Sequence, residues 1–252
     1  MEMNGYRPGT PSWVDLGSPE PAESAAFYSG LFGWTIEEGP PEAFGYCMCL
    51  LRGRPVAGIG GAMEPGRPFW TTYINTPDAD TTAKSVSANG GEVLLDPVDV
   101  LTRGRLAILT DPSGVRFSLW EPGSLIGSGV VNEPGTPTWH ELVTRDPDAA
   151  LRFYPAVFGW GTQSHGTPPC TMWTIDGEPV AGMHTMDEDW PEDVPPHWNV
   201  YFAVADVDAT VARAVDLGGS VVAPADDLEV GRFAGLADPH GAVFSVITLK
   251  QR

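Results

Sequence analysis

Apolar and polar residues alternate in short runs along the whole chain, and the first of these runs leads into a helical pattern. The run 12–16 predicts a strand. The segment 18–32 predicts a helix, because proline and acidic residues favour a first turn and Gly33 provides a stop. Two further runs, at 44–51 and 55–62, predict strands joined by a tight turn.

A second set with the same order follows. The run 69–75 predicts a strand, and 78–89 predicts a helix that Asp78 caps and two glycines close. Three more strands are then predicted, at 93–95, 105–110 and 115–120. Each set is therefore a strand, a helix and about three strands.

The whole pattern occurs twice. The stretch 9–34 returns as 135–160 at a constant offset of 126, and 11 of its 26 positions are identical. Shorter matches follow in the same order, namely 55–58 with 179–182, 104–105 with 231–232, and 111–114 with 238–241. Because internal repeats fix an architecture, we expect four units, at roughly 11–66, 69–121, 137–190 and 197–249.

The repeat divides the chain into two domains, 9–121 and 137–252, joined by a linker at 122–136 that is rich in glycine. A unit this short cannot bury both faces of its sheet alone. Two units together would form one curved sheet with helices outside and a concave face, which we call a cup, where a ligand would sit. The sequence leaves open which units pair.

Composition narrows the classes of partner. The net charge is −19, from 14 Lys and Arg against 33 Asp and Glu, which argues against nucleic acid and anionic membranes. Such a charge serves solubility and would also attract a cationic small molecule. No run of 18 apolar residues or signal peptide occurs, and the three cysteines form no CxxC pair, so we expect a reduced cytoplasmic protein.

Two motifs in each half resemble a known family. They are F-Y-x-x-x-F-G-W at 27–34 and 153–160, and D-P-x-G-x-x-F at 111–117 and 238–244. In combination they resemble the vicinal oxygen chelate superfamily, which includes glyoxalases, extradiol dioxygenases and bleomycin resistance proteins. The resemblance implies an α+β fold of four βαβββ modules forming two glyoxalase-like domains, each a curved mixed-sheet cup with helices outside.

The resemblance also implies a divalent metal ion in the cup. Its typical ligands are a His on the first strand of a module and a Glu on the last strand, four residues after the DPxG glycine. At these positions this sequence has Val14, Thr71, Ser118, His140, Asn199 and Ser245. A transition-metal site needs three or more His, carboxylate or thiolate groups, so we predict cups with no metal ion and no other cofactor.

Several acidic and histidine residues lie near these positions. Asp15 and Glu141 adjoin Val14 and His140, and strand alternation predicts that both carboxylates face away from the cup. A metal centre built from His140 with Glu121, Glu141 or His184 stays open as an alternative.

Aromatic residues and methionines are predicted to line the cups. Tyr73, Trp120, Tyr201, Met48 and Met172 share the alternation phase of the cup face, and such side chains suit a flat apolar ligand. They could equally fill the cup themselves. Trp70 and Trp198 have the opposite phase and are expected under the helices. Arg105 and Arg232 start equivalent strands, where a structural ion pair or a contact with an anionic ligand would fit.

The first hypothesis is a metal-free protein that binds an aromatic natural product or antibiotic, of polyketide type, with a cationic group. It would serve sequestration, self-resistance or biosynthesis, the last beside a partner enzyme. His140, Asn199, Ser118 and Ser245 would orient the ligand. The alternatives are a metal-dependent glyoxalase, dioxygenase or hydroxylase with one degenerate cup, and a metal-free enzyme that uses His140 as an acid or base.

Overall fold

The computed structural model describes residues 1–62, 66–165, 170–188 and 190–250. Its first half contains β1 (Pro11–Ser18), α1 (Pro21–Phe32), β2 (Thr35–Glu38), η1 (Pro41–Ala43), β3 (Cys47–Leu51), β4 (Arg54–Gly61), β5 (Phe69–Asn75), α2 (Ala79–Ala88), β6 (Glu92–Val100), β7 (Gly104–Thr110) and β8 (Arg116–Pro122). Its second half contains β9 (Thr136–Thr144), α3 (Pro147–Phe158), β10 (Gly161–His165), β11 (Cys170–Ile175), β12 (Glu178–Thr185), β13 (His197–Ala203), α4 (Val207–Asp216), β14 (Ser220–Asp227), β15 (Gly231–Ala237) and β16 (Val243–Leu249).

Local signals set the helix limits. The carboxylates of Asp78, Asp146 and Asp206 each accept a backbone N–H of the first turn that follows, so these residues cap α2, α3 and α4. Gly33 ends α1 in the left-handed conformation, with φ of 73°. The two helices predicted in the first half are therefore confirmed. The prediction missed β2, which pairs with β3. The strand expected at 44–51 is the shorter β3.

Adjacent modules pair through their first strands. β1 lies antiparallel to β5, and β9 lies antiparallel to β13. Each half is thereby one mixed eight-stranded sheet, in the orders β2-β3-β4-β1-β5-β8-β7-β6 and β10-β11-β12-β9-β13-β16-β15-β14. The only bridge between the two sheets in the described residues joins Phe69 and Val243. The predicted α+β fold of four βαβββ modules is confirmed.

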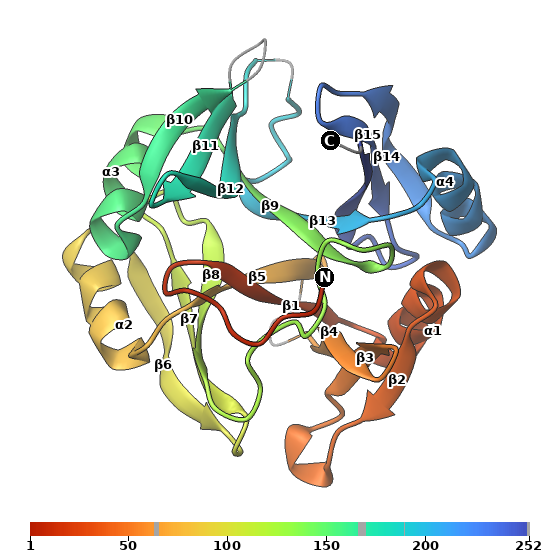
Figure 1. Cartoon of the computed structure of the whole chain (residues 1–252), viewed down its shortest axis with the longest axis horizontal. Helices are drawn as coiled ribbons and strands as arrows, with labels where there is room; N and C mark the ends of the chain where they lie inside the picture. Colours follow the sequence, from red (N-terminus) through yellow and green to blue (C-terminus); the bar gives the residue numbers. More distant parts are fainter. Residues whose placement is uncertain (63–65, 166–169, 189, 251–252) are drawn as a thin grey trace.

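The two sheets are curved, and their concave faces open in opposite directions, with the helices outside (Figure 1). Helix α1 of the first half lies beside α4 of the second, and α2 lies beside α3. One buried apolar cluster accordingly joins the first and fourth modules, and another joins the second and third. Trp70 and Trp198 belong to these clusters, so the prediction that they pack under the helices is confirmed.

Reciprocal hydrogen bonds fasten the halves together. Trp34 Nε1 donates to the carbonyl of Gly135 at 2.7 Å, and Trp160 Nε1 donates to the carbonyl of Gly9 at 2.9 Å. Both glycines have φ of 82°, a conformation that glycine adopts without strain. The F-G-W motif stands at the same place in both repeats, and its tryptophan forms the contact between the halves each time.

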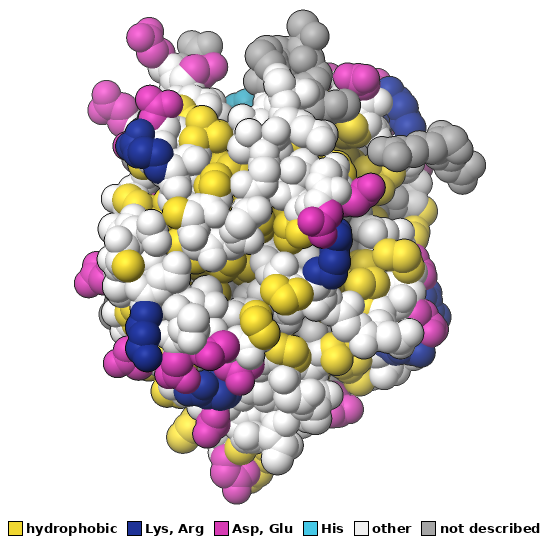
Figure 2. Space-filling view, turned by 60° about the vertical axis from the view of Figure 1, so that its left-hand side comes forward, with side chains coloured by type: hydrophobic (Ala, Val, Ile, Leu, Met, Phe, Trp, Pro, Cys, Tyr) yellow, Lys and Arg dark blue, Asp and Glu magenta, His cyan; other side chains and the backbone are white. Residues whose placement is uncertain are grey.

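Charge is distributed over the outside of the molecule. Figure 2 shows acidic side chains around the periphery of one face, with fewer basic ones among them and apolar side chains across the middle. In the part of the chain that the structure describes, no helix is long and apolar enough to cross a membrane.

Candidate functional site

The concave face of the first sheet is the first cup, and that of the second sheet is the second cup. The strand residues packed beneath the helices lie in the two buried apolar clusters. Because successive side chains on a strand point to opposite faces, the neighbours of these residues point into the cups. The first cup contains Asp15, Tyr73, Ser118, Trp120 and Met48, and the second contains Glu141, Asn199, Tyr201, Ser245 and Met172.

Two predicted orientations were wrong by one residue. Val14 lies in the apolar cluster beneath α1, and His140 bonds Thr72 on the side of β9 away from the second cup. Their neighbours Asp15 and Glu141, expected to face away, are the residues that point into the cups. The repeat contained a signal for this orientation. Asp15 and Glu141 occupy equivalent positions, and each lies two residues after a tryptophan.

A carboxylate lies at the bottom of the first cup. Asp15 Oδ2 accepts hydrogen bonds from Tyr73 Oη at 2.7 Å and from Tyr46 Oη at 3.4 Å. Tyr46 Oη in turn accepts from Trp13 Nε1 at 3.2 Å. Burial raises the pKa of Asp15 to about 6, although these hydroxyl groups and that of Thr71 oppose the shift.

The first cup is filled by its own side chains. Trp13, Met48, Tyr73, Trp120 and Leu125 form a buried cluster, with Tyr46 packed against it. The Leu125 carbonyl, in the segment between β8 and β9, accepts from Trp120 Nε1 at 2.8 Å. Little of the first cup is therefore left for a ligand.

The second cup has the same polar plan. Glu141 Oε2 accepts from Tyr201 Oη at 2.8 Å, as Asp15 does from Tyr73. Asn199 Nδ2 donates to Ser245 Oγ at 2.9 Å, and Asn199 Oδ1 has no partner among the described residues. Burial raises the pKa of Glu141, against the influence of the Tyr201 hydrogen bond and of His184.

Two large rings of the first cup are absent from the second. The repeat places Cys170 where the first half has Tyr46, and Ile247 where it has Trp120. Met172, Trp139, Glu141 and Asn199 are half-buried, whereas Met48 and Trp13 in the first cup are each 3% exposed. The second cup is thus the more open of two similar sites.

The residues present do not fit a divalent transition metal. In the first cup the acidic ligand is Asp15, and its neighbours are hydroxyl and aromatic groups. The second cup adds His184 and Cys170 to Glu141, yet no three His, Cys, Asp or Glu side chains of the described residues are grouped to hold a metal ion. The alternative centre of His140 with Glu121, Glu141 or His184 is not assembled.

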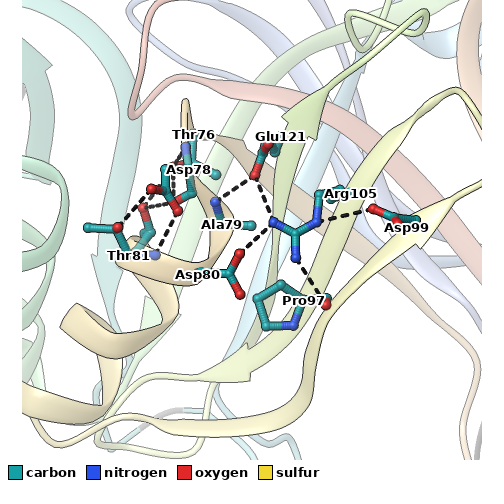
Figure 3. A network of polar contacts seen from close by, with 10 residues as sticks. Thr76, Asp78, Ala79, Asp80, Thr81, Pro97, Asp99, Arg105 and Glu121 are labelled. Carbon is teal, nitrogen blue, oxygen red and sulfur yellow. Dashed lines mark hydrogen bonds and ion pairs between the residues drawn. The ribbon is translucent and has the colours of Figure 1, made fainter.

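Other candidate residues have structural partners. Arg105 pairs with Asp80 at 2.5 Å, Asp99 at 3.2 Å and Glu121 at 3.5 Å, and Glu121 also accepts the backbone N–H of Ala79 at the start of α2 (Figure 3). Arg232 pairs in the same way with Asp208 and Asp227. Both arginines therefore anchor helix starts, which agrees with the structural alternative of the prediction.

Comparison with known proteins gives two family matches. A model described as the Glyoxalase/Bleomycin resistance protein/Dioxygenase superfamily matches residues 10–119, and one described as a glyoxalase-like domain matches residues 140–247. The anthracycline biosynthesis protein DnrV of Streptomyces peucetius is 44% identical over 99% of this chain and 96% of its own. CFP32 of Mycobacterium bovis, which its name marks as a candidate glyoxylase, is 43% identical over 96% of this chain and 95% of its own.

A solved structure shares the fold. The Mn(II)-bound glyoxalase of Novosphingobium aromaticivorans superposes with a TM-score of 0.67, over 97% of this chain and 83% of that one, at 16% identity. At that identity the likeness concerns the fold alone.

Proposed function

The chain belongs to the glyoxalase/bleomycin resistance protein/dioxygenase superfamily, and we propose that it binds an aromatic, polyketide-type small molecule in the second cup without a metal ion. The observation that carries this proposal is the exchange of Tyr46 for Cys170 between two otherwise similar cups. Where the first cup holds a ring that bonds Asp15, the second has a small side chain and leaves Glu141 half-buried beside Tyr201.

The lining suits such a ligand chemically. Met172, Trp139 and Phe233 offer polarizable and aromatic surface, which favours a flat molecule. Glu141, Tyr201 and Asn199 offer acceptors and donors for its hydroxyl and carbonyl groups. The relative DnrV is named for anthracycline biosynthesis, so an anthracycline or its precursor is the class we propose, with this chain in an accessory role beside a biosynthetic enzyme.

The charge of the chain adds a preference. With a net charge of −19, the protein attracts cations over a distance set by ionic strength. An amino-sugar glycoside should therefore bind more tightly than its uncharged aglycone, and added salt should narrow the difference.

A second candidate function is general acid–base catalysis on the bound molecule. It is favoured by the raised pKa of Glu141 and by the Tyr201 hydroxyl that bonds this carboxyl group. A raised pKa makes the protonated form of the carboxyl group easier to populate, as a general acid requires. Glu141→Gln separates the two functions, because loss of turnover with retained affinity would favour catalysis.

The proposal is tested by titrating the protein with doxorubicin and with doxorubicinone, its sugar-free aglycone, while tryptophan fluorescence is followed. Metal content is measured on the same samples. We expect saturable binding, stronger for doxorubicin, with far less than one transition-metal ion per chain. Stoichiometric metal that is needed for binding would overturn the metal-free part of the proposal.

Two variants locate the binding. Cys170→Tyr installs the ring of the first cup in the second and should weaken doxorubicin binding at least about tenfold, a change of about 1.4 kcal/mol. Cys170→Ser, which keeps the side chain small, is the matched control and should bind like the natural protein. Equal affinity in all three proteins would place the ligand elsewhere.

A further inference from the structure

A pocket of about 370 Å³ lies at the junction of the two halves. Its walls are the N-terminal segment 1–7, the starts of β1 and β9, and part of the linker between the sheets. This volume is at the low end of the range of roughly 300–1,000 Å³ that is typical of small-molecule sites.

The N-terminal wall is fastened to the linker. The backbone of Met3 donates to Gly129 at 3.0 Å, and that of Val131 donates to Met1 at 3.0 Å. Tyr6 Oη donates to the Ser128 carbonyl at 2.7 Å. The segment is thus held in place as one side of the pocket.

His140 lies in the lining with one ring nitrogen unused. Its Nδ1 lies 3.0 Å from Thr72 Oγ1, and Nε2 has no hydrogen-bond partner among the described residues. The side chain is 8% exposed, and burial lowers its pKa to about 3, so the imidazole is neutral at pH 7. Nε2 is not among the fully buried polar atoms that lack a partner, so it keeps access to the pocket that His140 lines and is free to hydrogen-bond a ligand there.

Comparison of the repeats shows that packing does not require this polar pair. The first half has Val14 where the second has His140, and the second half has Val200 where the first has Thr72. Both valines are fully buried in an apolar cluster. A histidine and a threonine thus meet at the junction where the related positions hold two valines.

The charge of the lining differs from that of the rest of the molecule. Although the chain has 33 acidic residues, Arg7 is the only charged side chain in the described lining. Trp13, Trp139 and several prolines add aromatic and apolar surface. The pocket therefore favours a neutral or anionic ring system, in contrast to the cationic ligand proposed for the second cup.

We propose that this junction pocket is a second ligand site, which binds a small aromatic hydroxy compound of two fused rings whose oxygen hydrogen-bonds His140 Nε2. The proposal does not depend on the function proposed for the second cup.

The test uses 2-naphthol and the full chain labelled with ¹⁵N in its histidine rings. We expect saturation to shift the His140 Nε2 resonance, which is assigned by its loss in His140→Val. That variant reproduces the valine of the first half, and its affinity for 2-naphthol should fall at least about tenfold.

A second variant keeps His140 and blocks its surroundings. Thr138 lies two residues before His140 on β9 and also lines the pocket, so Thr138→Phe should also weaken binding at least about tenfold. Cys170→Tyr should leave 2-naphthol affinity unchanged. An unshifted His140 resonance at saturation, undiminished affinity in Thr138→Phe, or loss of binding in Cys170→Tyr would each overturn the proposal.

Discussion

Tyr46 lies so close to Gly58 that a Cβ atom on this glycine would come within 1.7 Å of the tyrosine hydroxyl oxygen. The ring covers β4, and the same atom takes part in hydrogen bonds with Asp15 and Trp13. The absence of a side chain at position 58 is therefore what allows Tyr46 to fill the first cup.

Gly58→Ala should expel the Tyr46 ring and lower the free energy of unfolding by about 1–3 kcal/mol, as overpacked cores do. Urea denaturation measures the change. In a Tyr46→Cys background the same alanine should cost at least about 1 kcal/mol less, because the clashing ring is gone. Additive costs in the double variant would show that the contact is not the cause.

The carboxyl group of Asp15 should make stability depend on pH. Its pKa in the folded protein is about 6, whereas an unfolded aspartate has a pKa of about 3.9. The folded state thus binds more protons between these values, and Asp15 lowers stability progressively as pH rises from about 4 to 6. A difference of two pKa units corresponds to about 3 kcal/mol of stability. Solvent that reaches the carboxyl group reduces this effect.

Asp15→Asn isolates this effect from the many other carboxylates. Between pH 4 and pH 7, the natural protein should lose about 2–3 kcal/mol relative to the variant, when both are unfolded with urea at each pH. Parallel profiles for the two proteins would mean that Asp15 titrates normally.

The fold could be predicted from the sequence because its signals are local and repeated. The caps at Asp78 and Asp206, the glycine stop at Gly33 and the 126-residue repeat each have one physical meaning. The crosswise packing of α1 on α4 and of α2 on α3 could not be predicted, since it depends on contacts between residues far apart in sequence.

The cup residues were predicted with one systematic error. The predicted His140 lies six residues before the helix cap Asp146, whereas the residues that face the cups lie five or seven before a cap: Glu141 lies five before Asp146, and Asn199 lies seven before Asp206. An even count on a strand selects the wrong face. The filling of the first cup by Tyr46 was also missed, because it depends on a contact with Gly58 that only the fold creates.

The tryptophans that end the F-G-W motifs should contribute to stability through the junction of the halves. Trp160→Phe keeps an aromatic ring but leaves the Gly9 carbonyl without its donor, which should cost about 1–3 kcal/mol. Trp190→Phe changes a less buried tryptophan and is the control, with an expected change within about 0.5 kcal/mol. Similar losses in the two variants would show that the indole hydrogen bond contributes little.

Helices α1 and α3, which carry the F-Y motifs, are each joined to the D-P-x-G turn of the other half by a buried tyrosine–aspartate pair. The two pairs should contribute differently to the free energy of unfolding. Tyr154 Oη donates to Asp111 Oδ2 at 3.2 Å, while Tyr28 Oη lies 3.5 Å from Asp238 Oδ2, which Ser24 also contacts at 3.4 Å. Asp238 therefore keeps a donor to this oxygen when Tyr28 is changed.

Tyr154→Phe should accordingly cost about 2–3 kcal/mol at pH 7 and Tyr28→Phe about 1–2 kcal/mol, as measured by urea denaturation. Each variant also removes the acceptor of a tryptophan N–H, Trp198 or Trp70, so this loss is common to both. Burial already raises the pKa of Asp111, so lowering the pH should protonate this group and diminish the deficit of Tyr154→Phe. A greater loss for Tyr28→Phe would contradict the assignment of Ser24 as the compensating donor.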